Sequence, residues 1–187
     1  LFEPIRKANP FFHFMESLWM IEGREDVDFL VKYNKGMNSF SDDGKTFNGA
    51  YGYRWRNFYA KDQLNIIVER LKNNPDDRRC VVAMWECTND LDRNTLDTPC
   101  NTHIYFKIRK NKLNMTVCCR SNDMIWGAYG ANAVHFSMLQ EYMASRIGVE
   151  VGVYNQISDS FHVYVDLFNE MDKAMPDEDF YSLKYPM

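Results

Sequence analysis

The chain has 187 residues, of which 45% are hydrophobic and 15% aromatic, and its net charge is −4. This composition predicts one ordered globular domain with a sizeable core and excludes a mainly disordered chain. The negative charge excludes general attraction to nucleic acid, so an anion site would need a local arginine cluster. No apolar run approaches the roughly 20 residues of a membrane span, and we find no signal-peptide pattern.

The cysteines indicate a reducing compartment. There are five of them, an odd number, and none has C-x-x-C spacing. This pattern favours free thiols over a disulfide framework or a zinc site, so we expect a cytoplasmic protein without a structural metal. The sequence starts at Leu1 without a methionine. We therefore expect residues 1–187 to form a single domain that lacks its extreme terminal segments.

The first predicted helix covers Phe11–Ile21. Asn9 supplies a capping side chain, Pro10 suits the first turn, and Gly23 suits the end. The run is apolar nearly all round, which predicts a buried helix. Glu16 interrupts the run, and a carboxylate there is costly unless it is paired or used. It is therefore either a charge on the helix surface or a functional group.

Three further segments precede the first strand. Val27–Tyr33 is a short predicted helix, and the polar segment Ser39–Gly49 is a predicted loop. Taken alone, the aromatic segment Tyr51–Arg56 predicts a strand at the edge of a sheet. Asp62 caps the next helix, whose apolar residues keep helical spacing until Asn73-Asn74-Pro75 stops it.

The second half of the chain alternates strands and helices. We predict a strand at Cys80–Trp85 and a hairpin of Ile104–Ile108 and Leu113–Cys119, joined by the polar turn 109–112. A core helix at Ala133–Ile147, a strand-rich segment at Val149–Tyr164 and a helical then polar tail at Asp166–Met187 follow.

Four residues with reactive side chains are predicted to be structural. Cys118 and Cys119 are adjacent in a predicted strand and would point to opposite faces. His103 and His135 have no partner at metal-ligand spacing in the sequence.

The stretch from Asp97 to Asn132 carries the strongest candidate site. Pro99 precedes Cys100 at a strand start, a turn that can present a thiol. Arg120, twenty residues on, can supply a positive charge that favours both a thiolate and a bound phosphate. Taken alone, a cysteine like Cys100 is more often a buried packing residue.

These segments resemble the thymidylate synthases and the related pyrimidine-nucleotide hydroxymethylases. The resemblance rests on Pro99-Cys100, on Arg120-Ser121-Asn122-Asp123, on Glu16-x-x-Trp19, on Tyr51-Gly52-x-x-Trp55-Arg56 and on Asp77-Arg78-Arg79 before a strand. Downstream landmarks keep the family's spacing: Asn132, Glu150-Val151-Gly152, His162 and Tyr164.

The resemblance implies an α/β (α+β) fold: a twisted, mainly antiparallel sheet with helices on one face and a symmetric homodimer interface on the other. It also implies transfer of a one-carbon unit from 5,10-methylenetetrahydrofolate to C5 of a pyrimidine nucleoside 5′-monophosphate. The implied catalytic residues are Cys100 as nucleophile, Glu16 for proton transfers through water, Tyr51 near the base and Asn132 as the residue that orients the base. The other implied contacts are Arg120 and Ser121 with the phosphate, Arg78 and Arg79 with the phosphate across the dimer, His162 and Tyr164 with the sugar, and Asp123 with the folate.

Several positions depart from the synthase pattern. Cys100 is followed by Asn101 and not by histidine, and Met37 and Phe40 fall approximately where synthases have two tryptophans beside the folate. The segment 128–131 is one residue longer than usual, and the family's upstream phosphate arginine loop and folate-closing tail have no counterpart.

These departures favour water over hydride as the group that completes the reaction, and hence a nucleotide hydroxymethylase. An amide at Asn132 suits uracil, so dUMP is the favoured substrate, with dCMP or CMP left open. A thymidylate synthase and a nucleotide-binding homologue without catalysis are the alternatives.

Overall fold

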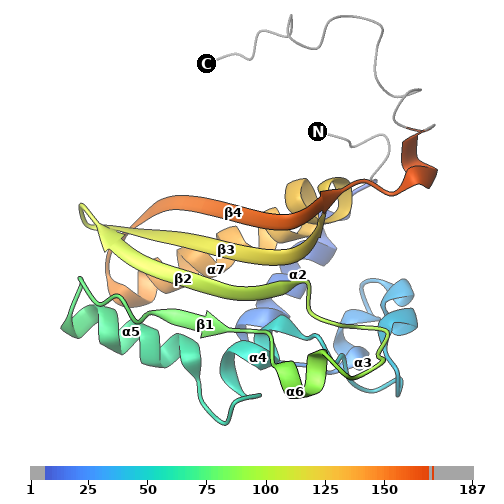
Figure 1. Ribbon diagram of the computed structural model, residues 1–187, viewed down its shortest axis with the longest axis horizontal. Coiled ribbons are helices and arrows are strands. Elements are labelled where there is room, and N and C mark those ends of the chain that lie inside the picture. The colour runs from blue at the N-terminus through green and yellow to red at the C-terminus, as the bar shows by residue number, and fades with distance from the viewer. Residues whose placement is uncertain (1–6, 169, 171–187) are drawn as a thin grey trace, which may run out of the picture.

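The protein is built on a four-stranded mixed sheet, seen in a computed structural model that describes residues 7–168 and 170 (Figure 1). The strands are β1 (Val81–Ala83), β2 (Asn101–Arg109), β3 (Lys112–Asp123) and β4 (Glu150–His162), in that spatial order. The first two pairings are antiparallel and β3 pairs with β4 in parallel. The mainly antiparallel α+β sheet predicted from the sequence is confirmed.

The helices are α2 (Pro10–Ile21), α3 (Val27–Leu30), α4 (Tyr51–Arg56), α5 (Gln63–Asn73), α6 (Cys87–Asp90) and α7 (Asn132–Ile147). Segments of 3₁₀-helix cover Lys35–Phe40 and Val165–Leu167, and a π-helical segment, Met124–Ala131, leads into α7. A parallel pairing needs a crossover connection, and α7 provides it between β3 and β4. Over the described residues, no helix is both long and apolar enough to cross a bilayer.

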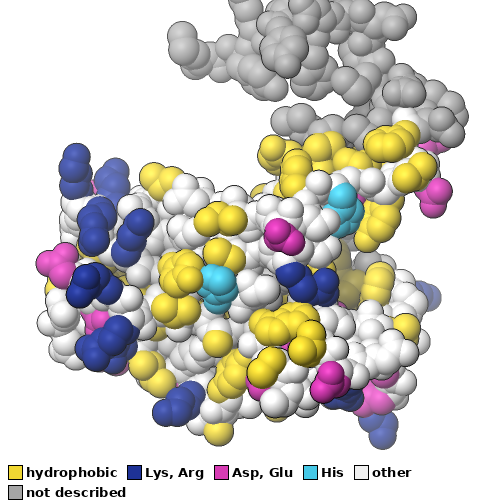
Figure 2. Space-filling view, viewed as in Figure 1, with side chains coloured by type: hydrophobic (Ala, Val, Ile, Leu, Met, Phe, Trp, Pro, Cys, Tyr) yellow, Lys and Arg dark blue, Asp and Glu magenta, His cyan; other side chains and the backbone are white. Residues whose placement is uncertain are grey.

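The core lies between the sheet and the helices. α7 packs on β3 and β4, and α2 and α5 pack against α7. Strand side chains alternate in burial: Ile104 and Phe106 of β2 face the core, whereas Tyr105 between them is 44% exposed. No described helix covers the outer face of the sheet, which carries exposed apolar side chains that Figure 2 shows from that side; they include Tyr105, Val153 and Ile157.

Local capping explains α2, but its burial differs from the prediction. The Asn9 side chain accepts a hydrogen bond from the Phe12 amide at 3.0 Å, and Pro10 is the first helical residue. The helix was predicted to be buried nearly all round, and this is wrong, because Phe11, Phe14 and Leu18 are exposed. α2 packs on α7, α4 and α3, and these three exposed side chains show that the contacts do not surround it.

The segment Tyr51–Arg56 forms helix α4, so the strand edge was the wrong reading. Gly52 lies so close to α2 that a Cβ atom there would sit 1.9 Å from the Met20 carbonyl oxygen. Arg54 is fully buried and forms an ion pair with Asp90. Because both contacts involve residues distant in sequence, the local pattern alone could not predict them.

The remaining elements follow the predictions with shifted bounds. Asp62 caps α5 and the predicted hairpin is present, although β3 continues to Asp123. The helix predicted at Val27–Tyr33 already ends at Leu30, and a 3₁₀ turn overlaps the start of the predicted Ser39–Gly49 loop.

β1 is shorter than predicted because the amides of Met84 and Trp85 both donate to the Thr102 carbonyl, which ends the ladder. Cys118 is partly exposed and Cys119 buried, as expected for opposite faces. Most of the tail predicted at Asp166–Met187 lies outside the described residues.

Candidate active site

The topology brings one end of three strands together. Because β2 runs antiparallel to β3, and β4 runs parallel to it, the start of β2 lies beside the ends of β3 and β4. Cys100 directly precedes β2, and its carbonyl accepts the Arg120 amide at 2.9 Å. The same sheet end holds Ser121, Asp123 and His162, the last two being direct register partners.

A cavity of about 270 Å³ opens beside Cys100. All four residues predicted to be catalytic line it: Glu16 from α2, Tyr51 from α4, Cys100, and Asn132 from α7. Met37 and Phe40, the residues at the expected folate wall, line it as well. Side chains from four separate parts of the chain thus converge on one apolar cavity, which has room for a planar ring against its apolar wall.

Opposing effects act on the pKa of the Cys100 thiol. Burial raises its pKa above the ordinary value, Arg120 lowers it, and Asp97 raises it further. Arg120 donates to the carbonyls of Pro99 at 3.0 Å and Thr98 at 3.1 Å, so its charge is fixed behind the thiol loop. The predicted assistance from Arg120 is present, but burial outweighs it and the resting thiol stays protonated.

Tyr51 completes the surroundings of the thiol. Its hydroxyl interacts with the Cys100 thiol and with the Asn101 amide. Burial raises the pKa of this hydroxyl far above its ordinary value, so the group remains a protonated donor. The ring stacks on Phe136 of α7 with centroids 6.1 Å apart.

Glu16 contacts two histidines: His13, three residues earlier on the same helix, and His135 of α7, which the sequence did not reveal as a partner. Its Oε2 atom lies 2.9 Å from His135 Nε2 and 3.5 Å from His13 Nδ1. Burial by itself raises the pKa of this carboxyl, but the contacts with the two histidines prevail and lower it to about 2. His135 was predicted to be merely structural without a site partner, and the structure corrects this, because it lines the cavity and contacts Glu16.

Asn132 belongs to a short chain of polar side chains. Its Nδ2 donates to Asn122 Oδ1 at 3.0 Å, and Asn122 Nδ2 donates to Ser158 Oγ at 2.9 Å. Asn122 is 2% exposed. Sequence reasoning gave Asn122 no role, although its place inside the Arg-Ser-x-Asp segment was visible.

Asp97 is a second residue that the sequence analysis left without a role. It lines the cavity, and its Oδ2 accepts the Gly49 amide at 2.8 Å. Burial raises the pKa of this carboxyl, while the Gly49 amide and Arg54 lower it. Its position directly before Thr98-Pro99-Cys100 was the available signal.

The other predicted residues lie outside the cavity. His162 and Tyr164 sit at the end of β4 with their rings 5.5 Å apart. Asp123 accepts the amides of Ile125 and Trp126 at 2.9 and 2.5 Å, and so starts the π-helical segment.

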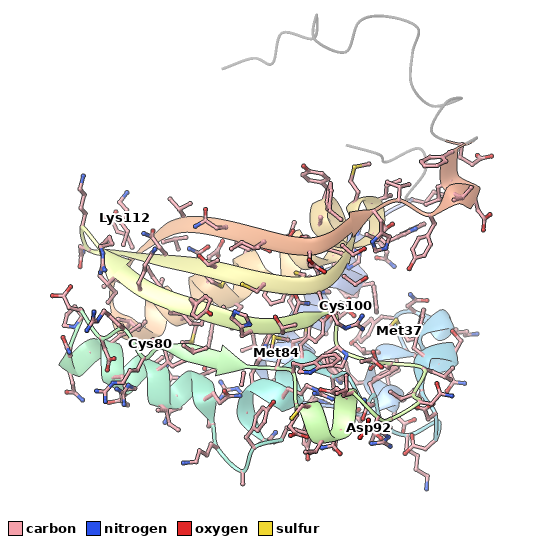
Figure 3. All side chains as sticks on the ribbon, viewed as in Figure 1. Met37, Cys80, Met84, Asp92, Cys100 and Lys112 are labelled. Atoms are coloured by element: carbon pink, nitrogen blue, oxygen red, sulfur yellow. The ribbon has the colours of Figure 1, made fainter. Side chains whose placement is uncertain are left out.

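Arg78 and Arg79 are exposed and precede β1, whose start pairs with the middle of β2, away from Cys100. Figure 3 shows the neighbouring Cys80 well away from Cys100. Within one chain these two arginines do not reach the cavity.

A metal ion was not expected. In the part of the chain that the structure describes, one group of side chains, His13, Glu16 and His135, offers ligand atoms within 4.8 Å of one another. The same atoms make the ion-pair contacts described above, so the expected absence of a metal stays a prediction.

The fold and the cysteine-centred cavity define a protein of the thymidylate synthase type. A sequence model of the thymidylate synthase family matches residues 5–184, and the chain belongs to this family.

Two relatives with high identity come from phages. The chain is 54% identical over 172 residues to a deoxyuridylate hydroxymethyltransferase of Pseudomonas phage M6, covering 91% of this chain and 49% of that protein. It is 47% identical to a deoxyuridylate hydroxymethyltransferase of Bacillus phage SP01, covering 86% and 45%. A "Putative thymidylate synthase" of Methanothermobacter marburgensis is 35% identical, covering 92% and 77%. The chain therefore spans about half the length of the two phage relatives.

Proposed function

We propose that this protein transfers a one-carbon unit from 5,10-methylenetetrahydrofolate to C5 of dUMP and completes the reaction with water, giving the hydroxymethyl nucleotide. The observation that carries the proposal is the convergence of Cys100, Glu16, Tyr51 and Asn132 on one cavity. The names of the two phage relatives support the same substrate and product.

Cys100 is the proposed nucleophile. C5 of uracil reacts poorly until a thiolate adds to C6, which places enolate-like charge on the ring. Because burial keeps the resting thiol protonated, addition requires loss of that proton. The fixed guanidinium of Arg120 behind the loop favours the thiolate once the proton leaves.

Asn132 is the residue proposed to recognise the base by hydrogen bonds. With Nδ2 directed at Asn122 Oδ1, the Asn132 oxygen is left to accept N3–H of uracil, and the second amide hydrogen can donate to O4. Cytosine has no N3–H and carries an amine at C4, so it does not match this arrangement. The polar chain to Ser158 supports uracil over cytosine.

The cavity wall favours water as the final reactant. Loss of the folate leaves an exocyclic methylene, which takes either a hydride from the folate or a water molecule. Met37 and Phe40 line the cavity where the resemblance places larger tryptophans, and Phe40 is 53% exposed. A less tightly closed wall lets water reach the methylene.

We further propose that the site is shared in a homodimer. Arg120 and Ser121 hold the phosphate from within, His162 and Tyr164 contact the sugar, and Asp123 lies on the folate side. Arg78 and Arg79 of the partner subunit complete the phosphate site. Their exposure and the open apolar face of the sheet support this arrangement.

The test is product analysis with the full-length protein. Incubation with dUMP and 5,10-methylenetetrahydrofolate is expected to give a nucleotide with an added CH₂OH group and tetrahydrofolate. Parallel incubations with dCMP and CMP are expected to give no product. Dihydrofolate with a methylated nucleotide would identify a thymidylate synthase instead, and turnover of dCMP alone would contradict the role given to Asn132.

Two cysteine variants, measured side by side, separate a role in catalysis from a role in nucleotide binding. Cys100→Ser is expected to abolish product while the dissociation constant for dUMP changes little, because phosphate and sugar contacts come from other residues. Cys118→Ser is the matched control and should retain activity. Binding without turnover in the wild-type protein would favour the non-catalytic alternative.

A further inference from the structure

We propose that His135, assisted by His13, is a positioning residue that fixes Glu16 to hold the water that adds to the exocyclic methylene. This inference rests on the proposed hydroxymethylase function and deepens it. It assigns the choice of water over hydride to a histidine–carboxylate–histidine cluster, in addition to the open cavity wall.

The cluster is built by packing of α2 on α7. His135 follows Asn132 by almost one helical turn, so the residue proposed to read the base and the partner of Glu16 share one end of α7. His135 is 4% exposed and Glu16 is 14% exposed, while both line the cavity. The ring centroids of His13 and His135 lie 5.7 Å apart, and both rings contact the carboxylate.

The two carboxylate oxygens of Glu16 have different surroundings. Both histidine contacts, at 2.9 and 3.5 Å, fall on Oε2. Two imidazoles held against the same oxygen restrict the rotation of the carboxylate and favour its charged form. The second oxygen, Oε1, is then available as an acceptor for a water molecule in the cavity. Without the histidines, burial would raise the pKa of this carboxyl and weaken its charged form, which is the better acceptor for a hydrogen bond from water.

The chemical step balances without a redox partner. The water oxygen forms a bond to the exocyclic methylene carbon, and its O–H bond breaks as the proton passes by way of Glu16 to the solvent, because a carboxyl group whose pKa is about 2 does not keep a proton at neutral pH. The electron pair of the exocyclic C=C bond moves into the ring as an enolate. The enolate then restores the C5=C6 bond and expels Cys100 as a thiolate. A base that orients water in this way typically contributes 10²–10⁴-fold to a rate.

The test compares two measurements on the same enzyme. Tritium released from [5-³H]dUMP reports formation of the methylene intermediate, and hydroxymethyl nucleotide reports its hydration. In His135→Leu, the ratio of product to released tritium should fall by at least about tenfold. The KM for dUMP should stay within about twofold. Added 2-mercaptoethanol should capture the accumulated methylene as a thioether.

Conservative and control variants test the cause. His135→Gln keeps a donor for Glu16 Oε2 and should recover most of the ratio, whereas His103→Leu, on the opposite side of the sheet, should leave it unchanged. Glu16→Gln keeps the size of the side chain and should reproduce the defect of His135→Leu. This variant decides the question if His135→Leu does not fold.

Three results would overturn the inference. An unchanged ratio in His135→Leu, with wild-type protein making hydroxymethyl product, would refute this inference alone. Stoichiometric metal in the purified wild-type protein that is lost in His135→Gln would replace it with a metal centre. A wild-type protein that releases tritium but makes only methylated nucleotide would refute the proposed function as well.

Discussion

The Arg54–Asp90 pair offers a direct test of how the site is supported. Both side chains are 0% exposed. The guanidinium donates to the two carboxylate oxygens at 2.6 and 2.8 Å, and also to the carbonyls of Asn48 and Met84. The pair joins α4, which carries Tyr51, to α6 and to the end of β1. Asp90→Asn would leave a buried guanidinium without its counter-charge.

The expected cost is large. Removing one partner of a buried ion pair costs about 3–5 kcal/mol, compared with a total stability of about 5–15 kcal/mol for a typical domain. For a domain of this length, the same cost corresponds to a drop of roughly 6–20 °C in the unfolding midpoint. Urea unfolding followed by tryptophan fluorescence measures it. Asp92→Asn is the matched control, because Asp92 is exposed (Figure 3), and it should change stability by less than about 0.5 kcal/mol.

A double variant separates charge from packing. In Arg54→Met/Asp90→Leu no buried charge remains, so part of the lost stability should return. Recovery should be incomplete, because the carbonyls of Asn48 and Met84 lose their donor. A cost below about 1 kcal/mol for Asp90→Asn would refute the reasoning.

Three further predictions concern the cavity and the dimer. Gly52→Ala should destabilise the protein by roughly 1–3 kcal/mol or more in urea unfolding, since its Cβ would lie 1.9 Å from the Met20 carbonyl oxygen; unchanged stability would contradict this close approach. Alkylation of Cys100 by iodoacetamide, followed by mass spectrometry, should keep rising with pH beyond the plateau of an exposed thiol, because burial raises its pKa. Arg120→Leu should move that curve to still higher pH, and a plateau at neutral pH would oppose both expectations. Mixing Cys100→Ser with Arg79→Ala should restore activity through hybrid dimers, and no recovery in verified heterodimers would count against a shared site.

The sequence by itself determined the elements whose causes are local. The start of α2 follows from the Asn9 side chain and Pro10, and the start of α5 from the Asp62 carboxylate, which accepts the Asn65 amide at 3.0 Å. The hairpin of β2 and β3 follows from two alternating runs around a polar turn. These interactions span a few residues, so the local pattern contains them in full.

The sequence also predicted which residues meet, because the resemblance supplied a three-dimensional arrangement. Glu16, Tyr51, Cys100 and Asn132 lie far apart in the chain and line one cavity. Composition and periodicity alone would not have grouped them. Their chemical roles stay predictions that the proposed experiments address.

Tertiary structure decided the environment of each group. The sequence shows Glu16 three residues after His13 on the same helix, but only the packing of α2 on α7 adds His135, and the two histidines together lower the pKa of Glu16 to about 2. The sequence shows Arg120 twenty residues after Cys100, but in the folded protein burial raises the pKa of the thiol more than Arg120 lowers it. Segment Tyr51–Arg56 became a helix because Gly52 and Arg54 meet distant partners. Burial and non-local contacts control pKa values and pairing, and neither is encoded in a short window of residues.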